Sequence, residues 1–423
     1  MRSALLLGAA LALGLSAPAS ADTINILMEG VPDTEYVKSL VPEFEKATGH
    51  TVNLEVVNYA EMHTKLVPQL VAPTGSYTVI VVDFYWVGEF TKAGWLQPLD
   101  GSGSQTASAL VYVPPMTLVM QVDGTTYMLP FYNYAMGLLY RKDLIEDQAN
   151  KDAFKAKYGM ELRAPETWDE YLKQVEFFTK DGNYGVVNQG LRPDPIAMEW
   201  SNYLFANGGE YHTADWQPTL NTPAGIAAID QYATNIAKYG PTGAASFSFD
   251  EAFNVFAQGK AYSYITYNFF RPSTDDPSKS TIVGKAEIMP VPGPTPDKKG
   301  SLNGAWGWAI PKSSPNADAA WEFIKWVESK DIAVKRALQG GSPTRTDVFD
   351  DAEVNAKYPY AQNLKAMLLG SHNFPVFTYT PQLVEVLGRE LSLVVAGEKP
   401  AADALATVES EMADLARKDG KLK

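Results

Sequence analysis

Residues 78–86 read Thr-Val-Ile-Val-Val-Asp-Phe-Tyr-Trp. The run Thr78–Val82 is β-branched throughout, which is typical of a strand covered on both faces, as the strands of a parallel sheet are. Two further candidate strands precede it, Thr23–Leu27 and Val52–Val57, and apolar residues at helical spacing occupy the stretches between the strands. This alternation predicts a parallel sheet with helices on both of its faces, and therefore an α/β fold.

The alternation continues in a second section that begins after Pro130. Met136–Tyr140 and Ala261–Thr266 have the composition of strands. Residues 167–170, Thr-Trp-Asp-Glu, form a capping box and predict a helix that extends to Phe178. Further helices are predicted over residues 222–239, Phe249–Gln258, Asn316–Val327, Leu383–Val395 and Ala401–Arg417.

The composition narrows the classes of function. The chain has 423 residues and a formal net charge of −14, and 12% of its residues are aromatic. This length allows roughly two to three domains, and the acidic balance argues against a nucleic-acid partner. The chain has no cysteine, which excludes disulfides, thiolate metal sites and thiol catalysis. Its four histidines are far apart in sequence, so we expect no metal site and no cofactor.

The first 21 residues have the features of an export signal. Arg2 supplies a positive charge, Ala4–Leu15 is small and apolar, and Ala19-Ser20-Ala21 matches a signal-peptidase site. The apolar run is shorter than the about 18 residues that a membrane span needs. Because no cysteine is available for a lipid anchor, we expect a protein that is secreted to the periplasm and begins at Asp22.

Catalytic motifs are mostly missing. The sequence contains no G-x-S-x-G, no phosphate-binding G-x-x-x-x-G-K-[ST] and no G-x-G-x-x-G. The carboxylate pairs Asp275-Asp276 and Asp350-Asp351 lie among turn residues, where solvated loop charge explains them. A glycosidase needs two carboxylates that face one cleft, and the sequence leaves such a pair open. We expect a protein that is not an enzyme.

Aromatic and polar residues gather where the predicted strands end. Ligands of open α/β sheets bind beyond the carboxyl ends of the strands. A sugar offers a C–H face on which aromatic rings stack, and hydroxyls that bind carboxylates and amides. We therefore predict a carbohydrate or polyol site, although burial in the core is the alternative for each aromatic taken alone. The residues are Asp83, Tyr85 and Trp86 after Thr78–Val82; Tyr59 after Val52–Val57; Tyr267 and Asn268 after Ala261–Thr266; Tyr132 and Asn133 after Pro130; and Trp306 in Gly304-Ala305-Trp306-Gly307-Trp308.

A series of short motifs has a familiar order. It resembles the extracellular solute-binding proteins of ABC sugar importers, of the maltose-binding type, from about Ile24 to Val408. Each motif alone is weak, and it is their shared order behind an export signal that carries the resemblance. The motifs are FEKATGHTV at 44–52, GWLQPLD at 94–100, YMLP at 127–130, LYRKDL at 139–144, PETWDEY at 165–171, NGG at 207–209, GAWGWAIP at 304–311 and GSPTR at 341–345.

The resemblance implies a two-lobed periplasmic-binding-protein fold of type II, with a mixed sheet flanked by helices in each lobe and the ligand between the lobes. Lobe 1 would hold residues 22–131 plus 286–327. Lobe 2 would hold residues 132–285 plus 328–423, with the C-terminal helices. The implied ligand-binding residues are Asp83, Tyr85, Trp86, Tyr132, Asn133, Tyr267, Asn268, Trp306 and Arg345, with Glu29, Tyr59 and Trp200 as further candidates. Glu29 has an equal alternative as a helix-start carboxylate.

The predicted function is that of the substrate-binding protein of an ABC importer. It would capture a sugar, oligosaccharide or polyol by lobe closure and deliver it, as a monomer, to permease subunits in the inner membrane. Two alternatives remain open at this point. One is an exported carbohydrate-active enzyme. The other is a receptor for an anionic solute, such as a sugar acid or a glycerol phosphoester, with which Arg345 would pair.

Overall fold

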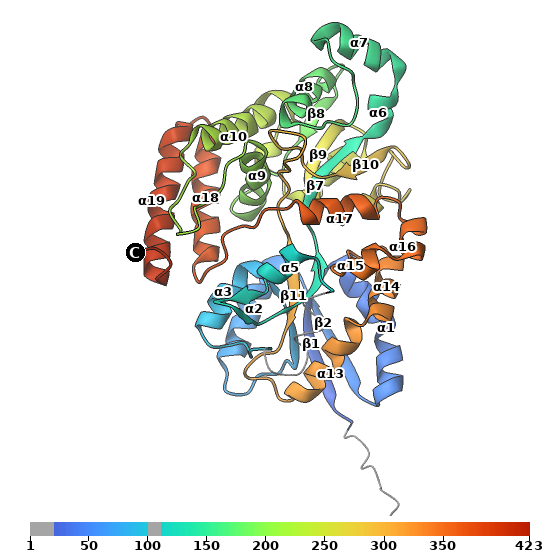
Figure 1. Ribbon diagram of the computed structural model, residues 1–423, viewed down its shortest axis with the longest axis vertical. Coiled ribbons are helices and arrows are strands. Elements are labelled where there is room, and N and C mark those ends of the chain that lie inside the picture. The colour runs from blue at the N-terminus through green and yellow to red at the C-terminus, as the bar shows by residue number, and fades with distance from the viewer. Residues whose placement is uncertain (1–20, 100–110) are drawn as a thin grey trace, which may run out of the picture.

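The computed structural model describes residues 21–99 and 111–423, and its chain builds two stacked α/β units (Figure 1). The predicted export signal lies outside the described residues, except for Ala21. Each unit has one principal sheet, five-stranded in the first unit and four-stranded in the second. None of the described helices is both long enough and apolar enough to cross a membrane.

The sheet of the first unit has the strand order β2-β1-β3-β11-β6. Its β1 pairs in parallel with β2 and β3, as the β-branched runs predict, whereas β11 lies antiparallel between β3 and β6. The sheet is therefore mixed. The strands are β1 (Thr23–Glu29), β2 (Thr51–Val57), β3 (Val79–Asp83), β6 (Leu129–Asn133) and β11 (Ala305–Ala309), and a separate ribbon pairs β4 (Gln121–Val122) with β5 (Thr125–Thr126).

Helices pack on this first sheet and on one another. Helix α1 ends at Gly49, whose φ of 80° favours glycine over residues that carry a Cβ atom. Helix α3 begins directly at the end of β3, because the side chain of Asp83 caps it by accepting from the Tyr85 amide. The helices of this unit are α1 (Pro32–Thr48), α2 (Tyr59–Val71), α3 (Phe84–Lys92), α5 (Pro114–Leu118), α13 (Ala317–Val327), α14 (Lys330–Leu338), α15 (Thr346–Phe349) and α16 (Ala352–Lys357).

The sheet of the second unit has the strand order β10-β7-β9-β8. The predicted capping residue Thr167 accepts from the Glu170 amide at 3.3 Å and begins α8. The strands are β7 (Met136–Arg141), β8 (Tyr184–Val187), β9 (Ala261–Tyr267) and β10 (Ala286–Met289). The helices are α6 (Lys142–Glu146), α7 (Gln148–Tyr158), α8 (Trp168–Phe178), α9 (Asp194–Ala206), α10 (Pro223–Thr234) with the π-helix η1 (Asn235–Tyr239), the short η2 (Ala244–Ser246), α11 (Phe249–Ala257), α12 (Phe270–Ser273), α17 (Ala361–Leu369), α18 (Thr380–Val395) and α19 (Ala401–Asp419).

Two boundaries of the predicted lobes differ from the packing of these elements. The stretch from 286 was predicted for lobe 1, yet β10 pairs with β7 in the second sheet, where Ala286 and Ile288 are buried. The stretch from 328 was predicted for lobe 2, yet α14 packs on α1 and α13 of the first unit. Lys335 of α14 forms an ion pair with Glu43 of α1. The chain joins the second unit again at α17, which packs on β10.

Candidate functional site

Strand pairing brings three of the predicted residues together at one end of the strands of the first sheet. In β11, Trp306 lies opposite Asp83 of β3 on one side and opposite Tyr132 of β6 on the other. This arrangement follows from the insertion of β11 between β3 and β6. The carboxyl end of β1 contributes Glu29, whose carboxylate accepts a hydrogen bond from the Tyr132 hydroxyl at 2.7 Å.

Aromatic rings pack closely around this edge. Tyr59 stacks on Trp86, with ring centroids 5.6 Å apart and an interplanar angle of 12°. Trp86 meets Trp306 edge to face at 5.7 Å, and Tyr132 stacks on Trp306 at 5.6 Å. Trp86 and Trp306 are each 6% exposed. Four predicted residues from separate segments of the chain thus form one aromatic group.

Two carboxylates, Glu29 and Asp83, lie beside these rings, and burial disfavours their charged forms. Burial raises the pKa of Glu29 to about 7, although the hydrogen bond from Tyr132 opposes the shift. Burial also holds the pKa of Asp83 well above its ordinary value. Asp83 is 3% exposed, and one of its oxygens accepts from the Tyr85 amide at 3.2 Å. A buried carboxylate is stabilised by donors, so these groups favour a ligand that supplies hydroxyls.

A third carboxylate, Asp194, comes from the second unit and is absent from the sequence prediction. It is the first residue of α9. Burial raises its pKa to about 7, and the nearby Tyr59 hydroxyl opposes the shift. Its charge contributes to the raised pKa of both Glu29 and Asp83, so the three carboxylates act on one another across the two units. The sequence Pro193-Asp194-Pro195 is typical of a turn, so the pattern alone did not indicate a ligand-binding residue here.

We call these residues the carboxylate–aromatic cluster. It consists of Glu29, Tyr59, Asp83, Trp86, Tyr132, Asp194 and Trp306. Across residues 21–99 and 111–423, no group of three or more histidine and carboxylate side chains is arranged to hold a metal ion. The chemistry of the cluster is therefore that of hydrogen-bond acceptors beside aromatic faces.

Two further predicted residues, Tyr85 and Tyr267, lie around the cluster, and a third, Trp200, lies in α9. The Tyr85 hydroxyl contacts the Met198 sulfur of α9, and its ring meets Phe374 at 5.3 Å. Burial and then the charge of Asp194 hold the pKa of Tyr267 well above its ordinary value, which places Tyr267 near the cluster. Trp200 is fully buried in α9, and its indole N–H has no hydrogen-bond partner among the described residues.

The two predicted asparagines have a different environment. The Asn133 amide nitrogen donates to the Asn303 side chain at 2.6 Å, and its amide oxygen accepts from the Ala135 backbone at 2.6 Å. Asn268 donates to the Asn133 carbonyl at 3.0 Å and accepts from the Ser342 hydroxyl at 3.2 Å. We call Asn133, Asn268, Asn303 and Ser342 the crossing network, because it joins the segments that pass between the units. Its amides are occupied by the protein itself.

Arg345 lies outside the cluster as well. Its guanidinium forms two hydrogen bonds with Asp347, at 2.9 and 2.8 Å, and a third with the Glu328 carbonyl at 2.8 Å. This bidentate pair satisfies the group that the sequence assigned to a ligand. Arg345 is also the N-cap residue of α15, although its side chain makes no capping hydrogen bond there.

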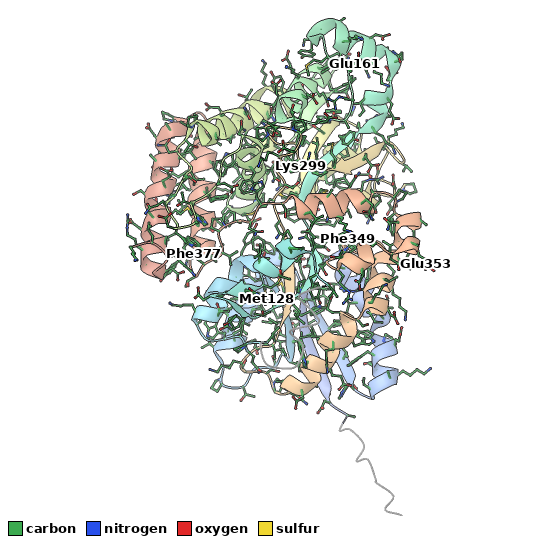
Figure 2. All side chains as sticks on the ribbon, viewed as in Figure 1. Met128, Glu161, Lys299, Phe349, Glu353 and Phe377 are labelled. Atoms are coloured by element: carbon green, nitrogen blue, oxygen red, sulfur yellow. The ribbon has the colours of Figure 1, made fainter. Side chains whose placement is uncertain are left out.

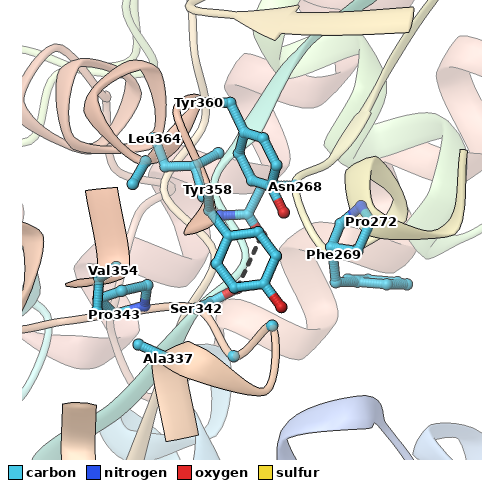
Figure 3. A pocket seen from close by; sticks show the side chains of 13 residues that line it. Asn268, Phe269, Pro272, Ala337, Ser342, Pro343, Val354, Tyr358, Tyr360 and Leu364 are labelled. Atoms are coloured by element: carbon cyan, nitrogen blue, oxygen red, sulfur yellow. Dashed lines mark hydrogen bonds between the residues drawn. The ribbon is translucent and has the colours of Figure 1, made fainter. Parts of the chain in front are cut away.

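A small pocket lies beside the crossing network (Figure 3). Figure 3 shows Tyr358, Tyr360 and Phe269 around it, with the hydrogen bond between Ser342 and Asn268 at its wall. Trp86 and Trp306 do not line it. In this conformation the rings of the cluster pack against one another.

Comparison with known proteins gives the family. The family model described as bacterial extracellular solute-binding protein matches residues 30–334. The chain is 24% identical to a probable amino-acid ABC transporter periplasmic-binding protein of Sinorhizobium fredii, over 92% of this chain and 88% of that protein. It is 26% identical to the mannitol-binding protein of Pseudomonas aeruginosa, over 97% of this chain and 96% of that protein.

Solved structures agree with this result. An ABC transporter solute-binding protein from Agrobacterium radiobacter, in complex with ribitol, is similar with a TM-score of 0.81 and 26% identity. The match covers 94% of this chain and 100% of that chain. The likeness confirms the predicted α/β periplasmic-binding-protein fold with two mixed sheets flanked by helices. This chain belongs to the bacterial extracellular solute-binding protein family.

Proposed function

We propose that this protein captures a neutral polyol or sugar for an ABC importer and binds it at the carboxylate–aromatic cluster. The observation that carries the proposal is that Glu29 and Asp83, from the first unit, lie within electrostatic range of Asp194, from the second, whose charge contributes to the raised pKa of both. In the part of the chain that the structure describes, none of the three forms an ion pair with a lysine or arginine. Donors from a ligand would stabilise all three.

The chemistry of the cluster favours hydroxyl groups over acidic ones. Each hydroxyl that donates to a buried carboxylate makes a charge-assisted hydrogen bond, and the C–H face of the same ligand can stack on Trp86 or Trp306. An anionic solute would meet the negative charge of each cluster carboxylate that is ionised, and the cluster contains no cation to offset it. Arg345, the cation predicted for such a solute, is paired with Asp347. These observations favour a neutral ligand over a sugar acid or phosphoester.

Two relatives support the ligand class. The Pseudomonas aeruginosa relative is a mannitol-binding protein, and the Agrobacterium radiobacter structure contains ribitol. Both ligands are neutral and carry a hydroxyl on every carbon. The family is a non-catalytic component of transporters, which removes the carbohydrate-active enzyme from consideration.

The proposed mechanism is a shift between open and closed forms. A ligand held by Asp194 on one side and by Glu29 and Asp83 on the other binds the closed form better than the open form, because only closure brings both sides to it. Such a ligand shifts the population towards closure by its difference in affinity for the two forms. The closed protein then delivers the solute to permease subunits in the inner membrane, from the periplasm. Trp200, with its unpartnered indole N–H, is a further candidate contact.

Calorimetric titration tests this function. We expect D-mannitol or ribitol to bind at pH 7.5, D-gluconate to bind far more weakly, and Asp194→Asn to weaken polyol binding. Asp350→Asn is the matched control, since Asp350 pairs with Lys365 far from the cluster in sequence. Tighter binding of D-gluconate than of any neutral polyol or sugar would contradict the proposal.

A further inference from the structure

Helix α3 meets the segment before α18 at a glycine. A Cβ atom placed on Gly88 would lie 2.5 Å from the Phe377 carbonyl oxygen and 2.9 Å from the Phe377 Cα atom. Both are backbone atoms, which cannot swing aside as the end of a flexible side chain can. The helix and the segment are therefore in contact only because residue 88 has no side chain. Figure 2 labels Phe377 in this segment, above the first unit.

This contact joins the two units. Helix α3 follows β3 and packs on the first sheet. The segment that contains Phe377 connects α17, which packs on β10, with α18, which packs on α9 and α19 of the second unit. The Phe377 ring lies 5.2 Å from that of Trp216, which follows α9 in the chain. The two sides of the contact thus belong to different units.

The contact is made by the helix that also carries Trp86 of the cluster. Tyr85, in the same helix as Gly88, reaches the Met198 sulfur of α9 and the ring of Phe374. Asp83, at the N-cap of that helix, belongs to the cluster. Opening of the cluster would therefore separate Gly88 from Phe377, and closure would bring them together.

Hydrogen bonds restrain the backbone on both sides of the contact. The Phe377 carbonyl accepts from the Thr380 amide at 3.2 Å and from its hydroxyl at 2.9 Å, and the Phe377 amide donates to the same hydroxyl at 2.9 Å. Thr380 is fully buried. On the other side, the Gly88 carbonyl accepts from the Thr91 hydroxyl at 3.1 Å. A methyl group at residue 88 would be accommodated most easily by separation of the two units.

We propose that Gly88 is a positioning residue for lobe closure: the closed form requires a bare backbone at residue 88, so that α3 can lie against Phe377. This inference rests on the proposed function, because it assumes that ligand binding closes the lobes. Gly88→Ala destabilises the closed form by overpacking while the ligand contacts stay in place. The expected result is an affinity for D-mannitol or ribitol that is weaker by on the order of tenfold.

Spin-label distance measurements test the proposal directly. The chain has no cysteine, so Thr64→Cys on α2 and Asp230→Cys on α10 give one exposed label on each unit. In this background we expect D-mannitol or ribitol to shorten the distance, and Gly88→Ala to leave a larger open population at the same ligand concentration. Gly30→Ala is the matched control, since a Cβ atom there has its nearest neighbours at 3.6 Å.

The outcomes separate the two proposals. Absence of any calorimetric binding by the background protein would count against the proposed ligand class. Equal closure and equal affinity in Gly88→Ala and its background would overturn the role of Gly88. A background distance that is the same in every condition would overturn it too, because α3 and Phe377 would then never separate. Failure of Gly88→Ala to fold would show a permanent packing contact and would also contradict the proposal.

Discussion

The carboxylate–aromatic cluster and the crossing network are both built from polar residues at strand ends, yet they differ in what those residues bind. In the network, the amide groups of Asn133 and Asn268 are held by other protein groups at 2.6–3.2 Å. In the cluster, burial raises the pKa of Glu29 and Asp194 to about 7 and that of Asp83 well above its ordinary value. The two regions therefore differ less in residue type than in hydrogen bonding. The amides of the network are paired within the protein, whereas the carboxylates of the cluster would gain from further hydrogen-bond donors.

The largest expected effect on the cluster comes from Trp306→Ala. Loss of a ring that packs on both Trp86 and Tyr132 should weaken polyol binding by about 3 kcal/mol, or over a hundredfold. Calorimetry measures the change, and Trp321→Ala on α13 is the control for the general loss of a tryptophan. Unchanged affinity in Trp306→Ala would remove this ring from the site.

A smaller loss is expected when one charge of the cluster is removed. Asp194→Asn keeps a hydrogen-bond acceptor but loses the charge-assisted bond, so we expect binding weaker by about 1.5 kcal/mol, or roughly tenfold. Glu29→Gln should have a similar effect from the other unit. If either change strengthened binding of a neutral polyol, repulsion among the carboxylates would outweigh their use as acceptors.

Acidification should favour the closed form of the ligand-free protein. The raised pKa of Glu29 and Asp194, about 7, belongs to the closed form, and the ordinary values, 4.5 and 3.8, to carboxylates in open water. The closed form therefore binds more protons, so its free energy falls relative to the open form as pH decreases from about 7 towards 4.5. Small-angle scattering should show a more compact protein at pH 5 than at pH 8. Equal dimensions at both pH values would contradict this assignment.

The smallest effect on affinity is expected in the crossing network. Asn133→Ala removes a buried amide and leaves the Ala135 amide without its acceptor, which should lower the free energy of unfolding by about 1–3 kcal/mol. Denaturant unfolding measures that loss. Polyol affinity should change by less than about threefold, because the proposed ligand contacts lie in the carboxylate–aromatic cluster and not in the crossing network. A loss of affinity as large as that of Asp194→Asn would move the network into the binding site.

The sequence was informative where local pattern determines structure. The β-branched run at 78–82 predicted β3, and Asp83, Tyr85 and Trp86 follow it at the sheet edge as expected. The helix over residues 168–178 was also predicted from its capping threonine. In each case the deciding interaction lies within a few residues of the chain.

What could not be predicted depends on contacts that are distant in sequence. Asp194 looks like a turn residue until α9 places it near Tyr59 of the other unit. Arg345 looks like a free cation until its pairing with Asp347 is known, and the asparagines look like ligand donors until their protein partners are known. Residue type identifies a possible partner, whereas tertiary structure decides which partner is present.

The central claim is that carboxylates from both units bind one neutral polyhydroxylated solute. The most direct measurement is calorimetric titration of the wild-type protein and of Asp194→Asn and Glu29→Gln with D-mannitol, ribitol and D-gluconate. We predict saturable binding of a neutral polyol, weakened by a change on either unit, with little or no binding of D-gluconate. Preferential binding of D-gluconate, or polyol binding that is indifferent to both substitutions, would contradict it.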